Sequence, residues 1–265
     1  MANAIEQVNA VTTPSRAFRD LLAELVEETT RTRHHGKPGL PAATKRRYAA
    51  RFADAIAPKD LASVDILLSH PLPSVRQVGG LILAREGMFA PETIAPRARR
   101  LALDEDWEVR EWAVEPYLRT LGHQPLAGLQ SWIEAGGRLR RAAVLAVRAL
   151  VLDGTLSASA SLRALDAVID DPDSYVQASV GGFLAGDALF RRYPRETAAY
   201  LAERVRAGAV NPVFWKNVRD ALRSNGARAG WTLIRDHLAA WTAAPVPAAV
   251  RRELDRLSEK EDVHA

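Results

Sequence analysis

The stretch DWEVREWAV (Asp106–Val114) is one copy of a short pattern that recurs along the chain. The other copies are LPSVRQVGG (Leu72–Gly80), GRLRRAAVL (Gly137–Leu145), DSYVQASVGG (Asp173–Gly182) and, more loosely, NPVFWKNVRDAL (Asn211–Leu222). They follow one another at intervals of roughly thirty to forty residues, which is the period of stacked helix–turn–helix units. The pattern therefore predicts an all-α fold, a helical-repeat solenoid (α-α superhelix) whose concave surface grips an extended partner.

Helical spacing continues outside these copies, whereas strand signals are nearly absent. Apolar residues over Phe18–Val26 and over Tyr48–Ile56 predict two amphipathic helices, separated by the loop HHGKPGLP (34–41). The stretch Ala243–Pro247 predicts a connector to a charged helix, Ala248–Glu261, whose polar surface suits a terminal cap. We expect one repeat domain over residues 1–265, with N-terminal helices and a basic loop in 1–56, repeats in 57–242 and a capping helix in 243–265.

The composition excludes several classes of protein. With 48% of its 265 residues hydrophobic, the chain can bury a substantial core. The absence of cysteine excludes disulfides, thiolate zinc sites and a cysteine nucleophile, and it fits a reducing cytoplasm. No apolar run is long enough to cross a bilayer, and Met1–Asn9 lacks the layout of a secretion signal. We expect a soluble, monomeric, cytoplasmic and nucleoid-associated protein with no membrane contact.

Known cofactor and metal motifs are missing from the sequence. It contains no P-loop, no dinucleotide fingerprint and no nucleophile elbow. The adjacent His34 and His35 do not make a metal site without further ligands, and the other histidines are scattered singly. We therefore expect neither a cofactor nor a metal ion.

Positive charge is concentrated in two places on a chain with a formal net charge of +4 and a pI of about 9.6. The first cluster has almost no compensating acid and contains Arg31, Arg33, His34, His35, Lys37, Lys45, Arg46, Arg47 and Arg51. The second consists of Arg138, Arg140, Arg141 and Arg148. Localised positive charge is expected for a protein that binds a polyanion such as DNA. A solvated, charged surface is the alternative interpretation.

Two predicted helices carry the side chains of interest: one an aromatic ring and a carboxylate, the other the arginines of the second basic cluster. On a helix beginning at Asp106, a turn of about 100° per residue brings Trp107 and Glu111 to one face, opposite a sector that contains Val109. An aromatic ring and a carboxylate thus lie one turn apart. On the helix from Leu139, small and apolar residues supply the packing side, and another side projects a basic stripe of Arg140, Arg141 and Arg148.

Three of these segments resemble the bacterial DNA alkylation repair glycosylases built from HEAT-like repeats, the AlkC/AlkD-like family. GRLRRAAVLAV (137–147) is similar to the arginine-bearing helix of that family, and DWEVREWA (106–113) is similar to its helix with a tryptophan and an acid. SYVQASVGGFL (174–184), followed by RRYP, is similar to the next repeat. The resemblance covers roughly residues 60–225 and implies a HEAT-like solenoid with a concave basic face.

The resemblance also implies an activity. Enzymes of this family are DNA repair hydrolases that excise cationic N3- or N7-alkylated purines from duplex DNA, and an acidic residue stabilises the positive charge that develops on the sugar. A fixed carboxylate suits this step because the charged base leaves without a general acid. By resemblance, Trp107 and Glu111 are the catalytic residues, and Arg140 or Arg141 is the DNA-docking arginine. Gly182 stands where the second aromatic residue of one branch is expected, with Phe183 next to it.

On this hypothesis, one concave face binds DNA phosphates through Arg140, Arg141, Arg148, Lys45, Arg46, Arg47 and Lys216. The alternative is a non-catalytic HEAT-repeat scaffold that binds DNA structures or a protein partner. On that view, Arg76 or Arg110 pairs with Asp104, Asp106 or Glu108 in a structural ladder, Glu111 is a solvated or ladder carboxylate, and Trp107 packs at a helix start. Trp215, beside Lys216 and Arg219, either packs or faces DNA.

Overall fold

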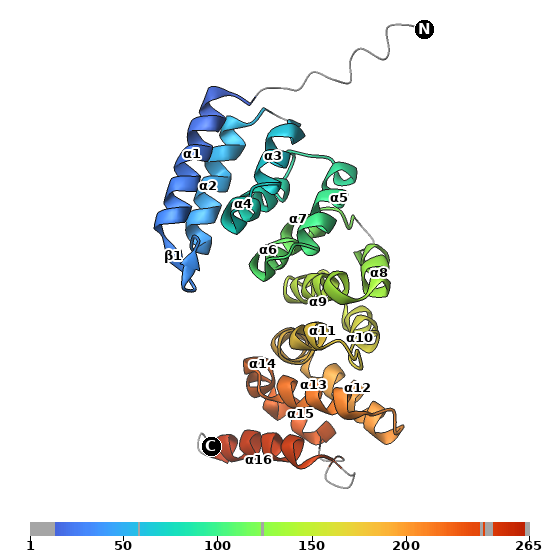
Figure 1. The fold of residues 1–265 in the computed structure, drawn as a ribbon. Coiled ribbons are helices and arrows are strands. Elements are labelled where there is room, and N and C mark those ends of the chain that lie inside the picture. Colours follow the sequence, from blue (N-terminus) through green and yellow to red (C-terminus); the bar gives the residue numbers. More distant parts are fainter. Residues whose placement is uncertain (1–13, 58, 123–124, 239–240, 242–245, 263–265) are drawn as a thin grey trace, which may run out of the picture. The chain divides into compact units, whose positions relative to one another are not determined.

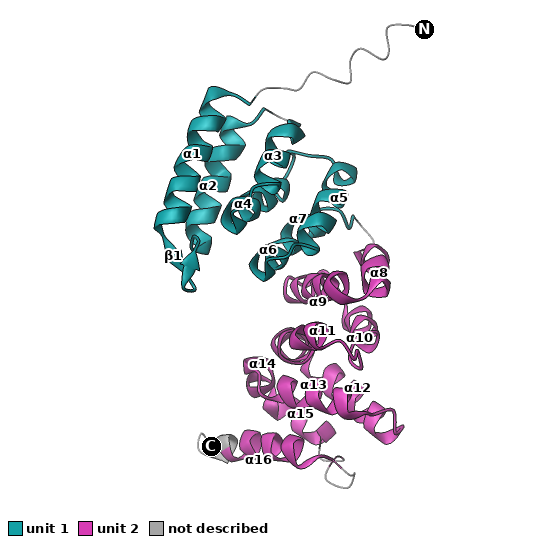
Figure 2. Ribbon diagram, in the orientation of Figure 1, with its two compact units in different colours: residues 1–122 teal, residues 123–265 magenta. Residues whose placement is uncertain are grey.

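The structure of the protein is a computed structural model that describes residues 14–57, 59–122, 125–238, 241 and 246–262. The described chain is predominantly helical, which confirms the predicted all-α class. The chain divides into two compact units, Met1–Gly122 and His123–Ala265 (Figure 2). We call them unit 1 and unit 2 and describe each by itself.

Unit 1 is built from helix pairs (Figure 1). Its elements are α1 (Arg16–Arg31), β1 (Arg33–His34), β2 (Lys37–Pro38), α2 (Ala42–Ala55), α3 (Leu61–Leu68), α4 (Pro73–Leu83), α5 (Pro91–Ala102), α6 (Trp107–Trp112) and α7 (Val114–Leu118). The second members of the pairs form one layer, because α4 packs against α2 on one side and against α6 and α7 on the other. Each of α1, α3 and α5 packs on the helix that follows it.

Two of these helices confirm predictions from the hydrophobic spacing. Helix α1 begins after Ser15, whose hydroxyl accepts a hydrogen bond from the backbone N–H of Phe18. Phe18 of α1 and Phe52 of α2 are fully buried, with ring centroids 5.2 Å apart in an edge-to-face arrangement. Aromatic pairs of this geometry stabilise a core beyond the area that they bury.

The helix predicted from Asp106 is divided in two. Helix α6 ends at Trp112 and α7 begins at Val114, with Ala113 between them. Pro116 has no N–H to donate to the carbonyl group of Trp112, so the α-helical ladder is interrupted there. The face of α6 that contains Val109 nevertheless lies in the core, as expected for the sector opposite Trp107 and Glu111, since Val109 is fully buried.

The segment predicted as the loop HHGKPGLP forms a short antiparallel hairpin instead. Arg33 pairs with Pro38 and His34 pairs with Lys37. The two residues between the strands, His35 and Gly36, have φ angles of 50° and 79°. Positive φ at both positions matches a two-residue turn whose twist suits a hairpin. Strand signals were too weak to predict this element because each strand is only two residues long.

Unit 2 has the same alternation of helices (Figure 1). Its elements are α8 (Pro125–Ala135), α9 (Gly137–Leu152), α10 (Ala158–Asp166), α11 (Ser174–Ser179), the π-helix η1 (Val180–Phe190), α12 (Pro194–Arg206), α13 (Pro212–Leu222), α14 (Asn225–Ala229), α15 (Trp231–Leu238) and α16 (Ala248–Asp262). Helix α9 packs on α8 and then on α11 and η1, and η1 in turn packs on α13, which contacts α16.

Glycine allows the close approach of η1 and α13. A Cβ atom on Gly181 would lie 2.8 Å from the carbonyl oxygen of Asn217, and one on Gly186 would lie 3.1 Å from the carbonyl oxygen of Ala221 and 2.6 Å from the Cβ atom of Ser224, just after α13. Neither position has room for a Cβ atom, so a larger residue at either one would push the two helices apart. Gly182 differs, since a Cβ atom there would meet nothing within 4 Å.

The predicted capping helix is confirmed as α16. Residues 243–245 of the predicted connector, and Met1–Asn9 at the N-terminus, lie outside the described residues. Within the described part of the chain, no helix is long and apolar enough to span a membrane.

Candidate nucleic-acid interface

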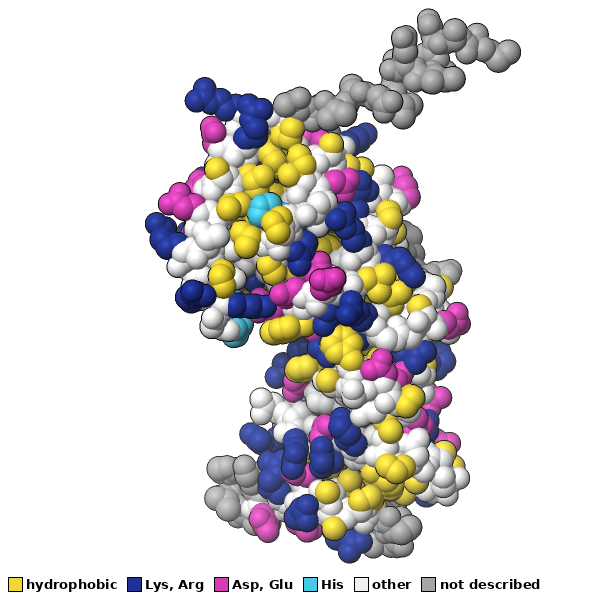
Figure 3. Space-filling model, viewed as in Figure 1, with side chains coloured by type: hydrophobic (Ala, Val, Ile, Leu, Met, Phe, Trp, Pro, Cys, Tyr) yellow, Lys and Arg dark blue, Asp and Glu magenta, His cyan; other side chains and the backbone are white. Residues whose placement is uncertain are grey.

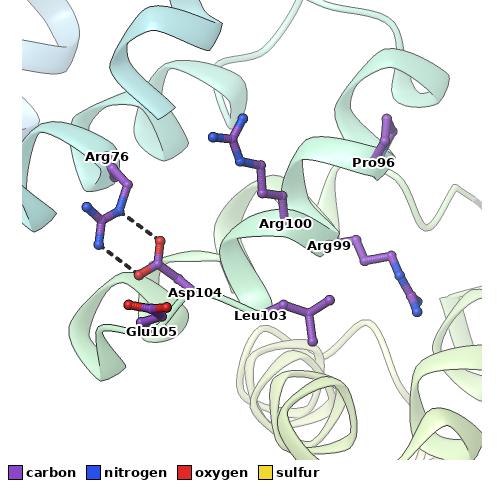
Figure 4. Close-up of a pocket in the computed structure, with 7 residues that line it drawn as sticks. All are labelled: Arg76, Pro96, Arg99, Arg100, Leu103, Asp104 and Glu105. Carbon is purple, nitrogen blue, oxygen red and sulfur yellow. Dashed lines mark hydrogen bonds and ion pairs between the residues drawn. The ribbon is translucent and has the colours of Figure 1, made fainter. Parts of the chain in front are cut away.

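A ladder of charged side chains links α4 to the turn before α6 in unit 1. Both oxygens of Asp104 accept hydrogen bonds of 2.8 Å from Arg76 of α4 (Figure 4). Asp104 also accepts from the backbone N–H of Asp106 at 2.8 Å, and Asp106 caps α6 by accepting from the N–H of Glu108 at 2.8 Å. The Arg76–Asp104 pair confirms the predicted structural ladder.

The pocket beside this pair does not form an anion site. It has a volume of about 600 Å³ and is lined by residues that include Arg76, Arg99, Arg100 and Asp104. The guanidinium group of Arg76 already donates two hydrogen bonds to Asp104. Arg99 points away from Arg76 and Arg100 (Figure 4). Arg100 donates to the hydroxyl group of Ser69 at 3.1 Å. The guanidinium groups of Arg76, Arg99 and Arg100 therefore do not point toward a common position where an anion could bind.

Unit 2 repeats the ladder with Arg140. Its guanidinium group pairs with Asp171, whose side chain is 1% exposed, and donates to the carbonyl oxygen of Ile133. Asp171 accepts from the N–H of Asp173 at 2.8 Å, as Asp104 does in unit 1. The expectation that Arg140 projects with Arg141 and Arg148 is therefore wrong, because a buried carboxylate already holds it. Arg140 occupies the ladder position.

Arg141 and Arg148 of α9 lie on aromatic rings of α11 and η1. The guanidinium carbon of Arg141 is 4.4 Å from the ring centroid of Tyr175, and its Nη1 atom donates to the Tyr175 carbonyl oxygen at 3.0 Å. The guanidinium carbon of Arg148 is 5.8 Å from the ring centroid of Phe183, which is 44% exposed. The sequence analysis did not predict these two aromatic partners. An alignment of the copies of the motif could have found them, because each arginine precedes the residue that supplies its ring by about the spacing between copies.

Helix α6 carries the predicted catalytic pair in unit 1. Trp107 is 51% exposed, so a large part of its surface is accessible. Glu111, one turn later, is half-buried. Trp107 and Glu111 belong to unit 1, whereas Arg140, Arg141 and Arg148 belong to unit 2. The single site that would join the two sets stays a prediction.

The basic residues predicted on α2 are engaged by acids or buried. Lys45 is 2% exposed and cannot reach a phosphate group, so its prediction as a DNA ligand is wrong. Arg46 forms an ion pair of 2.7 Å with Glu115, and Arg47 one of 3.3 Å with Glu28. Arg51, from the same cluster, forms an ion pair of 2.5 Å with Glu24.

The hairpin takes part in a charge network that sequence reasoning missed. Lys37 donates to Asp106 at 2.9 Å and lies 3.4 Å from Glu108, whose other oxygen lies 4.0 Å from the buried Lys45. The hydrogen bond to Asp106 raises the pKa of Lys37 above its ordinary value. Burial lowers the pKa of Lys45, although Glu108 opposes the shift. The network fastens the hairpin to the first turn of α6, beside Trp107.

Helix α13 holds the last predicted DNA ligand. The Lys216 ammonium group lies 3.5 Å from Asp220, and Arg219 reaches the same carboxylate at 2.7 Å. The Lys216 side chain is 42% exposed, so it remains accessible to a further anion. Trp215 is half-buried, with its ring centroid 6.0 Å from that of Trp241.

Among the described residues, no group of three or more histidine, aspartate or glutamate side chains is arranged to hold a metal ion. Comparisons with protein-family models and with curated proteins gave no match to this chain.

Proposed function

We propose that the protein is a DNA-binding HEAT-like helical-repeat protein and that unit 2 contacts the phosphate backbone through α9. One observation carries the proposal. Helix α9 contains Arg138, Arg140, Arg141 and Arg148 and no acidic residue, and two of these arginines lie on aromatic rings. Within the described part of the chain, Arg148 has no ion-pair partner.

An arginine that lies on a ring without a carboxylate partner, as Arg148 does among the described residues, differs from one that lies on a ring and is also paired with an acid, as Arg46 does. The ring supports the flat face of the guanidinium group, while the N–H groups in the plane remain able to donate to phosphate oxygens. A carboxylate, in contrast, uses those same N–H groups and cancels the charge. Because Phe183 is 44% exposed, the Arg148–Phe183 pair combines a held cation with an accessible apolar surface.

The rest of unit 2 is consistent with a polyanionic partner. Helix α13, which packs on η1, adds Lys216 and Arg219 against the single carboxylate of Asp220. Lys and Arg side chains also gather between α14 and α16 on the face drawn in Figure 3. Helix pairs at a regular period, with an arginine–aspartate ladder in both units, support the HEAT-like solenoid as part of the same proposal.

The proposal is tested with a labelled duplex of about 20 base pairs, whose affinity is measured between about 50 and 200 mM salt. The affinity should fall steeply with salt because bound cations release counterions. The double variant Arg141→Gln/Arg148→Gln should bind about tenfold more weakly, with a salt slope lower by about 2. The matched control is Arg195→Gln/Arg206→Gln on α12, which removes the same charge from exposed positions and should stay within about twofold. Equal losses in both variants would contradict an interface on α9.

The second candidate function is base excision, favoured by α6. An indole that is 51% exposed, one helical turn before a carboxylate, suits contact with a damaged nucleotide. On this proposal the substrate is duplex DNA with cationic N3- or N7-alkylated purines. The Glu111 carboxylate stabilises the oxocarbenium-like sugar while the base leaves, and water then completes the hydrolysis. No cofactor enters this reaction.

Release of 7-methylguanine or 3-methyladenine from duplex DNA tests this second candidate. The native protein should release the base and Glu111→Gln should not, whereas the control Glu105→Gln, an exposed acid near the same turn, should keep the activity. Salt-dependent binding without base release would leave the non-catalytic DNA-binding scaffold. Loss of both activities would favour a scaffold for a protein partner.

A further inference from the structure

A pocket in unit 2 lies between α13 and the start of α16. Its volume is about 470 Å³, within the range of small-molecule sites. Trp215, Lys216 and Arg219 of α13 line it together with Asn211, and Pro247 and Val250 line it near the start of α16. The pocket thus combines an aromatic wall, aliphatic surface and two cations.

The aromatic wall is held in place by its neighbours. The Trp215 ring meets the ring of Phe214 at 5.2 Å and that of Trp241 at 6.0 Å, with interplanar angles of 77° and 84°. Phe214 is fully buried and Trp241 is 1% exposed, so both supports belong to the core. An indole that is already ordered loses little conformational entropy when a flat ring stacks on it.

The polar side of the pocket carries excess positive charge. Lys216 and Arg219 share one carboxylate, that of Asp220, at 3.5 and 2.7 Å. Asn211 adds a donor, because its Oδ1 atom accepts from the N–H of Phe214 at 2.8 Å and its amide nitrogen remains to donate. A ligand that fits this lining has a flat aromatic part and an anionic part.

We propose that this pocket binds a single nucleotide, with the base on Trp215 and the phosphate between Lys216 and Arg219. Lys216 and Arg219 also add to the positive charge proposed for DNA binding, but nucleotide binding in this pocket does not require the arginines of α9. Stacking on an indole requires a base with an open face, which a free nucleotide or an unpaired end of a DNA strand provides and the interior of a duplex does not. The shared chemistry is a nucleobase with its 5′-phosphate.

Binding of adenosine 5′-monophosphate, adenosine and inorganic phosphate to the full chain is measured by isothermal titration calorimetry. The nucleotide should bind about tenfold more tightly than adenosine, because only it uses the cations. Trp215→Leu should weaken nucleotide binding about tenfold, whereas Trp215→Phe should retain most of it, since a base stacks on either aromatic ring. Lys216→Gln/Arg219→Gln should reduce nucleotide binding to the level of adenosine.

The control variant Arg195→Gln/Arg206→Gln should bind the nucleotide like the native protein, and thermal unfolding checks that every variant is folded. A single-stranded oligonucleotide and a blunt duplex, each offered as a competitor, distinguish the two sources of the ligand. Competition by the single strand assigns the site to DNA ends, and its absence assigns the site to a free nucleotide. The proposal is overturned if no nucleotide binds at about 5 mM, where a millimolar site would be mostly filled, or if Trp215→Leu changes nothing.

Discussion

The basic residues of α2 and those of α9 look alike in the sequence and meet different surroundings in the structure. On α2, Arg46, Arg47 and Arg51 lie over the rings of Trp112 and Tyr48, and each is also in an ion pair, with Glu115, Glu28 and Glu24 respectively. On α9, Arg141 and Arg148 face aromatic rings. A run of positive charge therefore does not define a binding surface, because distant acids that the fold brings opposite it decide how much of the charge remains.

The acids that neutralise α2 come from two elements at different distances along the chain. Glu24 and Glu28 lie on α1, which pairs with α2, and Glu115 lies on α7. Tyr48 adds a hydrogen bond of 2.5 Å to Glu28 and so helps to hold that carboxylate. In unit 2, the neighbouring segment offers the rings of Tyr175 and Phe183 to Arg141 and Arg148, and the carboxylate of Asp171 to Arg140.

The ladder is the feature that the two units share, and breaking it should have the largest effect. Asp171→Asn removes the charge from a side chain that is 1% exposed and leaves Arg140 without its partner. We expect a loss of about 3 kcal/mol in the free energy of unfolding, measured with urea. Glu134→Gln, an exposed acid on α8, is the control and should cost less than about 0.5 kcal/mol. A similar cost for both variants would mean that the Arg140–Asp171 pair is not structural.

The contrast between α2 and α9 is tested by removing the acids from unit 1. The triple variant Glu24→Gln/Glu28→Gln/Glu115→Gln releases Arg46, Arg47 and Arg51 from their ion pairs. If these carboxylates prevent the arginines of α2 from binding DNA, the affinity of the triple variant for a DNA duplex should be about tenfold higher at low salt. The control is Glu27→Gln/Glu92→Gln/Glu105→Gln, which changes the net charge equally at other exposed acids. An equal gain in the control would show that only net charge matters.

The hairpin network predicts a dependence of stability on acid pH. Burial alone would raise the pKa of Asp106, but the hydrogen bonds from Lys37 and from the N–H of Glu108 bring it below 3.8. A lowered carboxyl pKa stabilises the folded state above pH 3.8, and this contribution is lost as the pH falls through the lowered value.

Lys37→Met should therefore reduce the difference in stability between about pH 6 and pH 2.5 by roughly 0.5–1 kcal/mol, a small value because Lys37 is partly exposed. Urea unfolding at both pH values measures it. An unchanged difference would mean that Lys37 does not hold the hairpin on α6.

The smallest effect is expected at Phe183. Phe183→Leu keeps an apolar side chain and removes the ring under Arg148, which should cost about 0.5 kcal/mol of stability. Thermal unfolding measures the change, and Phe183→Tyr, which keeps a ring, should restore the native value. A loss in both variants would indicate that the packing of η1, and not the arginine, is affected.

The sequence by itself determined the helical class and the Arg76–Asp104 pair of the ladder. Both depend on local patterns, so Arg76 and the charged helix predicted over Ala248–Glu261 were found without coordinates. The repeat arrangement stays a prediction. The pairing of an aromatic ring with a carboxylate on α6 was also visible, because Trp107 and Glu111 are one helical turn apart.

Only the tertiary structure decided which charged residues remain accessible. Lys45 is buried among Trp112 and Glu108, and Arg140 is held by Asp171, because contacts between residues distant in sequence set burial and ion pairing. The hairpin at Arg33–Pro38 likewise depends on the bond from Lys37 to Asp106, 69 residues away. No local pattern encodes such contacts, since they arise when separate helices pack.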